Sequence, residues 1–323
     1  MAISSYPNGF NYGVSIRGMP LLQSYPGNVY WLDSVNGSDG NPGTFTLPVA
    51  TLTTALVQCT ANQGDIIMVK PGHAETISTA AGIVLSKAGV AIIGMGVGSK
   101  RPTFTWSAAT STITITANNI AIQNFLFLGT AATTFTATAF SNANAVVGND
   151  FIIDSCEFRD SDATHGFIAC YTGGTTANQS DGLTFTNNRV LRYLTSPPAA
   201  NTAVVTQAAI DRLTFSGNFI VNKTVNNNVA VGFALGSNAV QNLQCNGNRT
   251  YSLNITNTAG ELFSGGSTSS SGLLYDNICW TLAASAGAGL LCPLNTKIGM
   301  GAGNYSGITG AHDKQAALNP LAT

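Results

Sequence analysis

The sequence has few charged residues. Lys and Arg total 13 and Asp and Glu total 14, so 8% of the 323 residues are charged, where a soluble domain usually has about 25%. The net charge of −1 excludes nucleic-acid binding by counterion release, because that mode needs a basic surplus. The scarcity of Glu, Lys and Arg also excludes coiled coils and long helical bundles. We therefore expect no nucleic-acid partner and a surface of Thr, Ser and Asn.

Long hydrophobic runs and clustered metal ligands are also lacking. No run of about 18 apolar residues occurs, so we expect no membrane-spanning segment. Residues Met1–Pro7 have neither a basic segment nor an apolar core, which argues against a signal peptide. The six cysteines are scattered, without a CxxC pair or a His cluster, so we expect no metal site, no cofactor and mainly buried thiols.

A recurring phrase between residues 119 and 281 is the main signal for the fold. Apolar and polar residues alternate, two turn-formers such as Asn-Asn or Gly-Asn follow, and an apolar residue comes next. Copies begin 30 to 32 residues apart, at Ile120, Phe151, Leu183, Leu213, Leu243 and Leu273. Alternation with period two indicates strands rather than helices, and a repeat of this length is typical of one solenoid coil. We predict an all-β, right-handed parallel β-helix with coils of about 30 residues.

Stacked coils place equivalent residues above one another. Asn188, Asn218 and Asn248 share one phase of the repeat, and amides stacked at strand spacing can hydrogen-bond along the stack. We interpret these three residues as a structural asparagine ladder. Glu157 and Arg189 share the next outward position, so we expect them to pair across adjacent coils.

The two ends of the chain differ from the repeats. Residues 29–64 are predicted to form an N-terminal cap, because Leu52, Ala55, Leu56 and Cys59 have the spacing of a short amphipathic helix within Thr51–Cys59. An open solenoid end needs such a cap. We therefore expect one domain, residues 29–298, with the cap at 29–64 and the coils at 65–298.

Residues 1–28 and 299–323 are predicted to be extended terminal arms. They are rich in Gly and Pro and cannot form a core of their own. Two interpretations remain open: the arms are frayed termini, or they order against neighbouring subunits. The residues available for such contacts are Tyr6, Phe10, Tyr12, Leu21, Leu22 and Tyr25.

The N-terminal half carries a family resemblance. The segments Trp31–Asp39, Ala50–Leu52, Gly64–Ile77 and Gly148–Asp160 resemble pectin-lyase-like β-helix proteins and, more narrowly, a tailed-bacteriophage family of β-helix virion proteins. The resemblance covers residues 29–160 at the level of motifs and the rest by repeat architecture. It implies a component of a phage particle and brings no catalytic residues.

Candidate catalytic residues are few. Asp154, Glu157 and Asp160 cluster in the sequence and are the carboxylates that glycoside hydrolysis or lyase chemistry would use. His73 and Glu75 would share one face of a strand. None of the hydrolase, metalloprotease or nucleotide-binding motifs occurs. We therefore predict that the protein is not an enzyme, the alternative being a polysaccharide lyase or glycoside hydrolase.

The leading hypothesis is a non-enzymatic bacteriophage structural protein that decorates or cements the capsid. The resemblance implies a homotrimer bound to the major capsid protein on the virion surface, after assembly in the cytoplasm of the host bacterium. The alternative is a tailspike or tail fibre protein that binds or depolymerises host surface polysaccharide. A third possibility is an adhesin that binds host glycan on exposed aromatic residues such as Tyr171, Tyr193 and Trp280.

Overall fold

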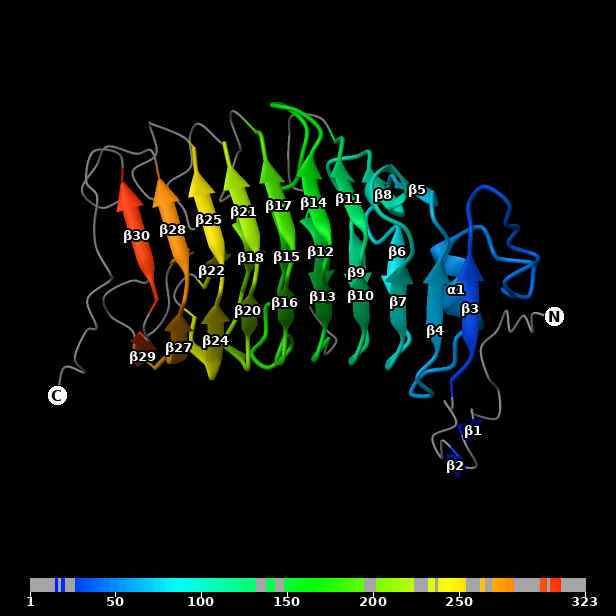
Figure 1. Ribbon diagram of the computed structural model, residues 1–323, viewed down its shortest axis with the longest axis horizontal. Helices are drawn as coiled ribbons and strands as arrows, with labels where there is room; N and C mark the ends of the chain where they lie inside the picture. The colour runs from blue at the N-terminus through cyan, green and yellow to red at the C-terminus, as the bar shows by residue number, and fades with distance from the viewer. Residues whose placement is uncertain are drawn as a thin grey trace.

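The chain folds as a right-handed parallel β-helix, which confirms the predicted fold class (Figure 1). The computed structural model describes residues 15–16, 19–20, 27–131, 138–142, 148–194, 202–223, 232–235, 238–253, 262–264, 269–281, 297–300 and 303–308. The coils stack along the long axis, with the N-terminal coils at the right of Figure 1 and the C-terminal coils at the left. Among the described residues, no helix is long and apolar enough to cross a membrane.

Three parallel sheets of 10, 9 and 7 strands form the walls within the described residues. The first sheet contains β3 (Val29–Leu32), β4 (Ile66–Val69), β7 (Ala91–Gly94), β10 (Ala121–Gln123), β13 (Ile152–Asp154), β16 (Thr184–Thr186), β20 (Thr214–Ser216), β24 (Leu243–Asn246), β27 (Ser271–Tyr275) and β29 (Lys297–Met300). The second sheet contains β5 (Ala74–Ile77), β8 (Thr103–Trp106), β11 (Leu126–Gly129), β14 (Glu157–Asp160), β17 (Arg189–Arg192), β21 (Phe219–Asn222), β25 (Arg249–Ser252), β28 (Ile278–Thr281) and β30 (Tyr305–Ile308). The third sheet contains β6 (Ile83–Leu85), β9 (Ile113–Ile115), β12 (Thr138–Asn142), β15 (Ala169–Thr172), β18 (Thr202–Val205), β22 (Phe233–Ala234) and β26 (Phe263–Ser264).

A two-residue bend joins the first sheet to the second in successive coils. Its first residue has a positive φ, for example 62° at Asn124, 55° at Asn187 and 66° at Gly217. Asn and Gly adopt this left-handed conformation at the lowest cost. The second residue of the bend points inward and is buried, as at Phe125 and Asn188. The turn-formers of the repeat therefore make a sharp corner that leaves the strand register unchanged.

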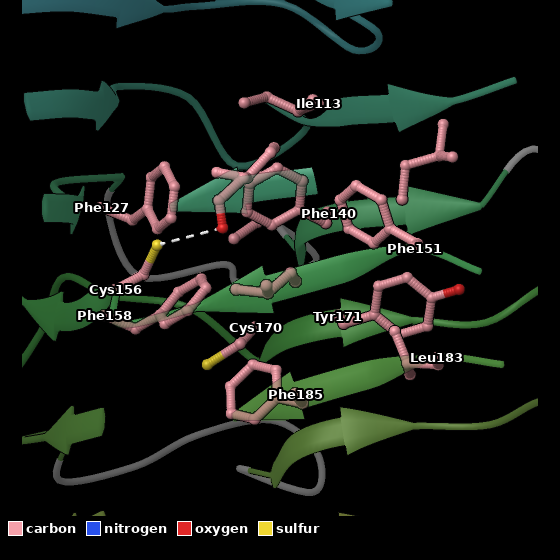
Figure 2. Close-up of a cluster of buried hydrophobic side chains, with 14 of the residues drawn as sticks. Ile113, Phe127, Phe140, Phe151, Cys156, Phe158, Cys170, Tyr171, Leu183 and Phe185 are labelled. Atoms are coloured by element: carbon pink, nitrogen blue, oxygen red, sulfur yellow. Dashed lines mark hydrogen bonds between the residues drawn. The ribbon is translucent and has the colours of Figure 1, made fainter. Parts of the chain in front are cut away.

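The core is a column of stacked aromatic and aliphatic side chains between the three sheets. Phe127 and Phe158 lie in register on β11 and β14, with ring centroids 4.9 Å apart. Phe185 and Phe215 stack at 5.4 Å with an interplanar angle of 6°. Figure 2 shows Phe127, Phe158 and Phe185 among the side chains that fill the space between the strands. Apolar residues at every second position of each strand supply this column.

Helix α1 (Leu52–Gln58) lies at the N-terminal end of the solenoid, as predicted (Figure 1). The Thr51 side chain caps it by accepting a hydrogen bond from the Thr54 backbone N–H, a preferred N-cap arrangement. The carboxylate of Glu75 accepts the Leu52 N–H at 3.0 Å. Leu52, Ala55 and Leu56 are buried, so the helix covers apolar core at this end.

The C-terminal end corrects two sequence expectations. Strands β29 and β30 pair with β27 and β28, so the solenoid continues to Ile308, and Gly299–Met300 and Tyr305–Ile308, which the sequence assigned to the arm, belong to its strands. Gly272, rather than Leu273, lies opposite Leu243, so the last repeat is one residue shorter than predicted. At the N-terminal end, β3 belongs to the first sheet although it falls in the segment assigned to the cap.

The predicted N-terminal arm falls largely outside the described residues. Within it the structure describes β1 (Ser15–Ile16) and β2 (Met19–Pro20), which pair antiparallel. The predicted contact residues all lie outside the described residues: Tyr6, Phe10, Tyr12, Leu21, Leu22 and Tyr25.

Candidate functional site

The three carboxylates proposed for catalysis do not converge on one site. Asp154 ends β13 on the outside of the first sheet, where its Oδ1 accepts hydrogen bonds from Thr186 Oγ1 at 2.7 Å and Asn187 Nδ2 at 2.8 Å. Glu157 begins β14, beyond the bend and on the second sheet. Asp160 is on the same strand but faces the interior and is 0% exposed. Strand alternation and the corner thus separate the three residues.

Asp160 belongs to a buried ion pair. Its Oδ1 lies 3.3 Å from Arg192 Nη1, and its carboxylate accepts the backbone N–H groups of Phe167 and Tyr193 at 3.0 and 2.9 Å. Burial raises the pKa of Asp160, and the Arg192 charge and these hydrogen bonds oppose the shift. Asp160 therefore links the chain at Phe167, Arg192 and Tyr193, and because it is buried a substrate cannot reach it.

Glu157 is the one of the three that lies in a cavity. Its Oε2 is 3.5 Å from Arg101 Nη1 and 3.9 Å from Arg189 Nη1, and its Oε1 accepts a hydrogen bond from Arg159 Nε at 2.9 Å. Glu157 and Arg189 are direct neighbours on β14 and β17, so their predicted pairing is confirmed. Arg159 lies two residues along the same strand and therefore on the same face.

We call the surrounding space the arginine cavity. It has a volume of about 430 Å³ and is lined by Gly98, Ser99, Arg101, Leu126, Glu157, Arg159 and Arg189. Three guanidinium groups face one carboxylate, which leaves an excess of positive charge. In addition, Arg101 Nε is buried without a hydrogen-bond partner. The cavity is therefore built to receive an anionic group.

Sequence reasoning found part of this cavity and missed Arg101. That residue precedes β8 and lies 56 positions before Glu157. It reaches the cavity because β8 pairs with β11 and β11 pairs with β14. The repeats that made Arg189 predictable begin only after Arg101, so no periodic signal could place it.

Aromatic side chains continue along the same outer face. Phe219 follows Arg189 in register on β21, and Tyr251 and Trp280 are neighbours on β25 and β28. The ring centroids are 5.7 Å apart for Phe219 and Tyr251 and 6.3 Å apart for Tyr251 and Trp280. We call Phe219, Tyr251 and Trp280 the aromatic row.

The other two aromatic residues proposed as sugar platforms are differently placed. Tyr171 is buried, and its hydroxyl donates a hydrogen bond to Ser180 Oγ at 2.9 Å or accepts one from it, so it cannot serve as a platform. The Tyr193 ring is half-buried and lies beneath Lys223 Nζ, 5.2 Å from the ring centroid. Of the three residues proposed, Trp280 alone belongs to the aromatic row.

The predicted asparagine ladder is present and longer than expected. Asn188 N donates to Asn218 Oδ1 at 2.9 Å, and Asn218 N donates to Asn248 Oδ1 at 3.0 Å. The ladder continues through Asn277 and Asn304, with bonds of 3.1 Å at each step. The side-chain nitrogens donate to backbone carbonyls of the first sheet, as from Asn188 Nδ2 to Ile153 O at 2.9 Å. All five asparagines are buried, which fits a structural role.

His73 and Glu75 also serve structure. His73 is buried, its Nδ1 accepts the Ser34 N–H at 3.0 Å, and its Nε2 lies 3.4 Å from Glu75 Oε2. The same Glu75 oxygen accepts the first N–H of α1. The pair therefore joins the capping helix to β5. Among the described residues, no group of three or more His, Cys, Asp or Glu could hold a metal ion.

The outer surface of the first sheet is apolar in its N-terminal half. The register runs through Val29, Ile66, Ala91, Ala121 and Ile152 in one outward column. The second column is apolar at Trp31, Met68 and Ile93 and then continues with the polar Gln123 on β10 and Asp154 on β13. We call the eight apolar residues the apolar face; each is half-buried. From β16 onward the same columns contain Thr184, Thr186, Thr214 and Ser216.

Three solved structures are similar to this chain. The sequence matches no protein-family model and no curated protein. A rhamnogalacturonan lyase matches at 14% identity and TM-score 0.38, over 79% of this chain and 69% of that chain. A GH136 lacto-N-biosidase from Eubacterium ramulus matches at 10% identity and TM-score 0.37, over 87% of this chain and 67% of that chain. The Dettilon tailspike protein matches at 15% identity and TM-score 0.34, over 85% of this chain and 66% of that chain.

These similarities concern the fold alone. They also correct one expectation. Two of the three matched proteins are enzymes by name, a lyase and a glycosidase. The prediction that this chain is not an enzyme therefore does not hold.

Proposed function

We propose that the protein is a structural subunit of a tailed-bacteriophage particle, where it decorates the capsid as a homotrimer bound to the major capsid protein. The apolar face of the first sheet is the observation that carries this proposal. Contiguous apolar surface on the outside of a soluble fold marks a site of association. One column stays apolar as far as Ile152 on β13 and the other as far as Ile93 on β7, which confines that site to the N-terminal half of the solenoid.

The sequence resemblance gives the assembly its proposed identity. Gly64–Ile77 and Gly148–Asp160, two of the segments that resemble phage virion proteins, contribute β4 and β5 and β13 and β14. Strands β4 and β13 provide Ile66, Met68 and Ile152 of the apolar face. The segments that carry the resemblance therefore also contribute strands to the apolar face.

We assign the apolar face to contacts between copies of this chain. The eight residues carry no charge, so they offer no ion pair by which a foreign surface could be selected. A second copy presents the same eight uncharged residues at the same strand spacing. Three parallel rods arranged around a threefold axis would each bury this face against a neighbour, which closes the assembly.

Two substitutions on this face test the association. Met68→Glu with Ile152→Glu should convert a trimer to a monomer in light scattering, because two carboxylates would be buried at each contact. The matched control is Thr184→Glu with Ser216→Glu, which adds the same charge to the polar half of the sheet. A trimer that survives the first pair, or a monomeric wild-type protein, would refute the assignment.

The position on the particle needs a separate measurement. Purified phage particles labelled with an antibody against this chain should show label over the capsid in electron micrographs. Label confined to tails would exclude a capsid role and favour the alternative of a tail protein.

A further inference from the structure

We propose that the arginine cavity binds the carboxylate or phosphate of an acidic glycan, whose sugar rings continue over the aromatic row. This inference concerns the outer surface of the second sheet and is independent of where the protein lies on a particle. The cavity concentrates three of the chain's 13 basic residues around a single glutamate.

The guanidinium groups keep donors available for a ligand. The side chains of Arg159 and Arg189 are 41% and 55% exposed, and an arginine offers five N–H donors in a planar fork. Glu157 has two oxygens and is shared by all three arginines. The side chain of Arg101 is 25% exposed, although its Nε is buried, so the ends of the guanidinium groups are the parts that a ligand would reach. Forked donors of this kind match carboxylate and phosphate oxygens.

Glu157 positions these donors. Three guanidinium groups this close together repel one another. The central carboxylate reduces that repulsion and leaves the net charge of the cluster positive. The volume of about 430 Å³ lies within the range of small-ligand sites. The turn at Gly98–Lys100 provides one wall, so the site is a cavity rather than a flat patch.

The aromatic row identifies the rest of the ligand as a sugar chain. Phe219 lies directly beside Arg189, and Tyr251 and Trp280 follow along the solenoid axis. Strands are about 4.8 Å apart, so the four steps from β14 to β28 span roughly 19 Å. Phe219 is 38% exposed, and Tyr251 and Trp280, in the neighbouring column, are half-buried, so each leaves part of its ring for the apolar face of a sugar. Arg249, opposite Phe219 on β25, adds a further cation to this path.

Binding of a hyaluronan tetrasaccharide, which contains glucuronate, tests the inference by calorimetry at low salt. We expect binding to the wild-type protein and a loss of about tenfold or more in Arg189→Ala, since a hydrogen bond to a charged group is lost. Arg212→Ala is the matched control, because the Arg212 side chain is 56% exposed, like that of Arg189, and does not line the cavity. It should leave the affinity unchanged.

Three further binding measurements test which parts of the ligand the protein recognises. The carboxyl-reduced, neutral tetrasaccharide should not bind. Trp280→Ala should weaken binding of the tetrasaccharide and leave binding of free glucuronate unchanged. A phosphate-bearing oligosaccharide that binds more tightly than hyaluronan would identify phosphate as the anionic group.

Two results would overturn the inference. Equal binding of the neutral tetrasaccharide would exclude an anion site. Binding of inorganic phosphate with no gain from an attached sugar chain, or no binding of any of these probes, would exclude a glycan.

Discussion

Arg192 Nη1 lies 3.3 Å from Asp160 Oδ1 inside the solenoid, with the two side chains 2% and 0% exposed. Arg192 also donates to Phe167 O at 2.7 Å and Thr202 O at 3.2 Å. Removing one partner of a buried pair leaves the other charge unpaired and costs about 3–5 kcal/mol. We predict a loss of this size in the free energy of unfolding for Asp160→Asn, measured by urea denaturation.

Two comparisons isolate the pairing. Arg249→Met removes an exposed arginine from the same sheet and should leave the unfolding midpoint nearly unchanged. The double variant Asp160→Leu with Arg192→Met should lose much less than the sum of the single variants, because neither charge remains buried alone. Additive losses would show that the pair does not act as a unit.

The interior of the asparagine ladder should be intolerant of truncation. Asn218→Ala removes the acceptor of Asn188 N and the donor to Phe185 O, leaving buried polar groups without partners. We expect a loss on the order of 3 kcal/mol in the free energy of unfolding. Asn246→Ala, on the outward side of β24, is the control. Similar losses in both variants would assign the effect to removal of an amide side chain in general rather than to the ladder.

The cysteines should be unreactive in the native protein. Burial raises the pKa of Cys59, Cys156 and Cys170 to about 12 in each case, and the thiolate is the reactive form. With Ellman's reagent at about pH 8, we expect no reaction from these three until the protein is unfolded. Val57→Cys, at a site 71% exposed, should label at once. Rapid native labelling of the wild-type protein, mapped to any of the three, would contradict this expectation.

Asp33 should contribute to acid sensitivity. Burial alone would raise its pKa, but hydrogen bonds from Val35 and Asn36 and the charge of Lys70 outweigh burial, so the pKa lies below 3.8. A lowered folded pKa stabilises the protein above the unfolded value, and that stability is lost as the pH falls through the folded pKa. We predict that Asp33→Asn lowers the melting temperature near neutral pH and that the difference from wild type shrinks below about pH 4.

The control for acid sensitivity is Asp276→Asn, at an exposed bend residue. Its melting temperature should run parallel to that of the wild type across the same pH series. A constant offset for Asp33→Asn would mean that the carboxylate acts through its shape rather than its charge.

Much of the fold was predictable because the repeat is local. Alternation located the strands, and the turn-formers located the corner where Asn187 has φ 55°. Asn277 was missed because the last repeat is one residue short, and counting in steps of 30 placed Ile278 in the ladder column. The β24–β27 pairing revealed the true register, in which Leu243 lies opposite Gly272.

The candidate site was only partly predictable. Glu157 and Arg189 are adjacent because their repeats stack in phase, which the sequence shows. Arg101 lies outside the repeats, and its approach to Glu157 depends on how β8, β11 and β14 stack. The cluster of Asp154, Glu157 and Asp160 shows the opposite error, because neighbours in sequence were separated by a corner and by strand alternation.

The sequence by itself determined the coil length, the inward and outward alternation, the corners and the scarcity of charge, because these follow from each residue and its near neighbours. Only the tertiary structure decided that three arginines meet one glutamate, that the apolar columns on the first sheet end at Ile93 and Ile152, and that Asp160 is paired in the core. Those features depend on which coils touch, and a stacked solenoid places residues about 30 or more positions apart in contact. Six of the 27 charged residues meet in this way, four at the arginine cavity and two in the Asp160–Arg192 pair.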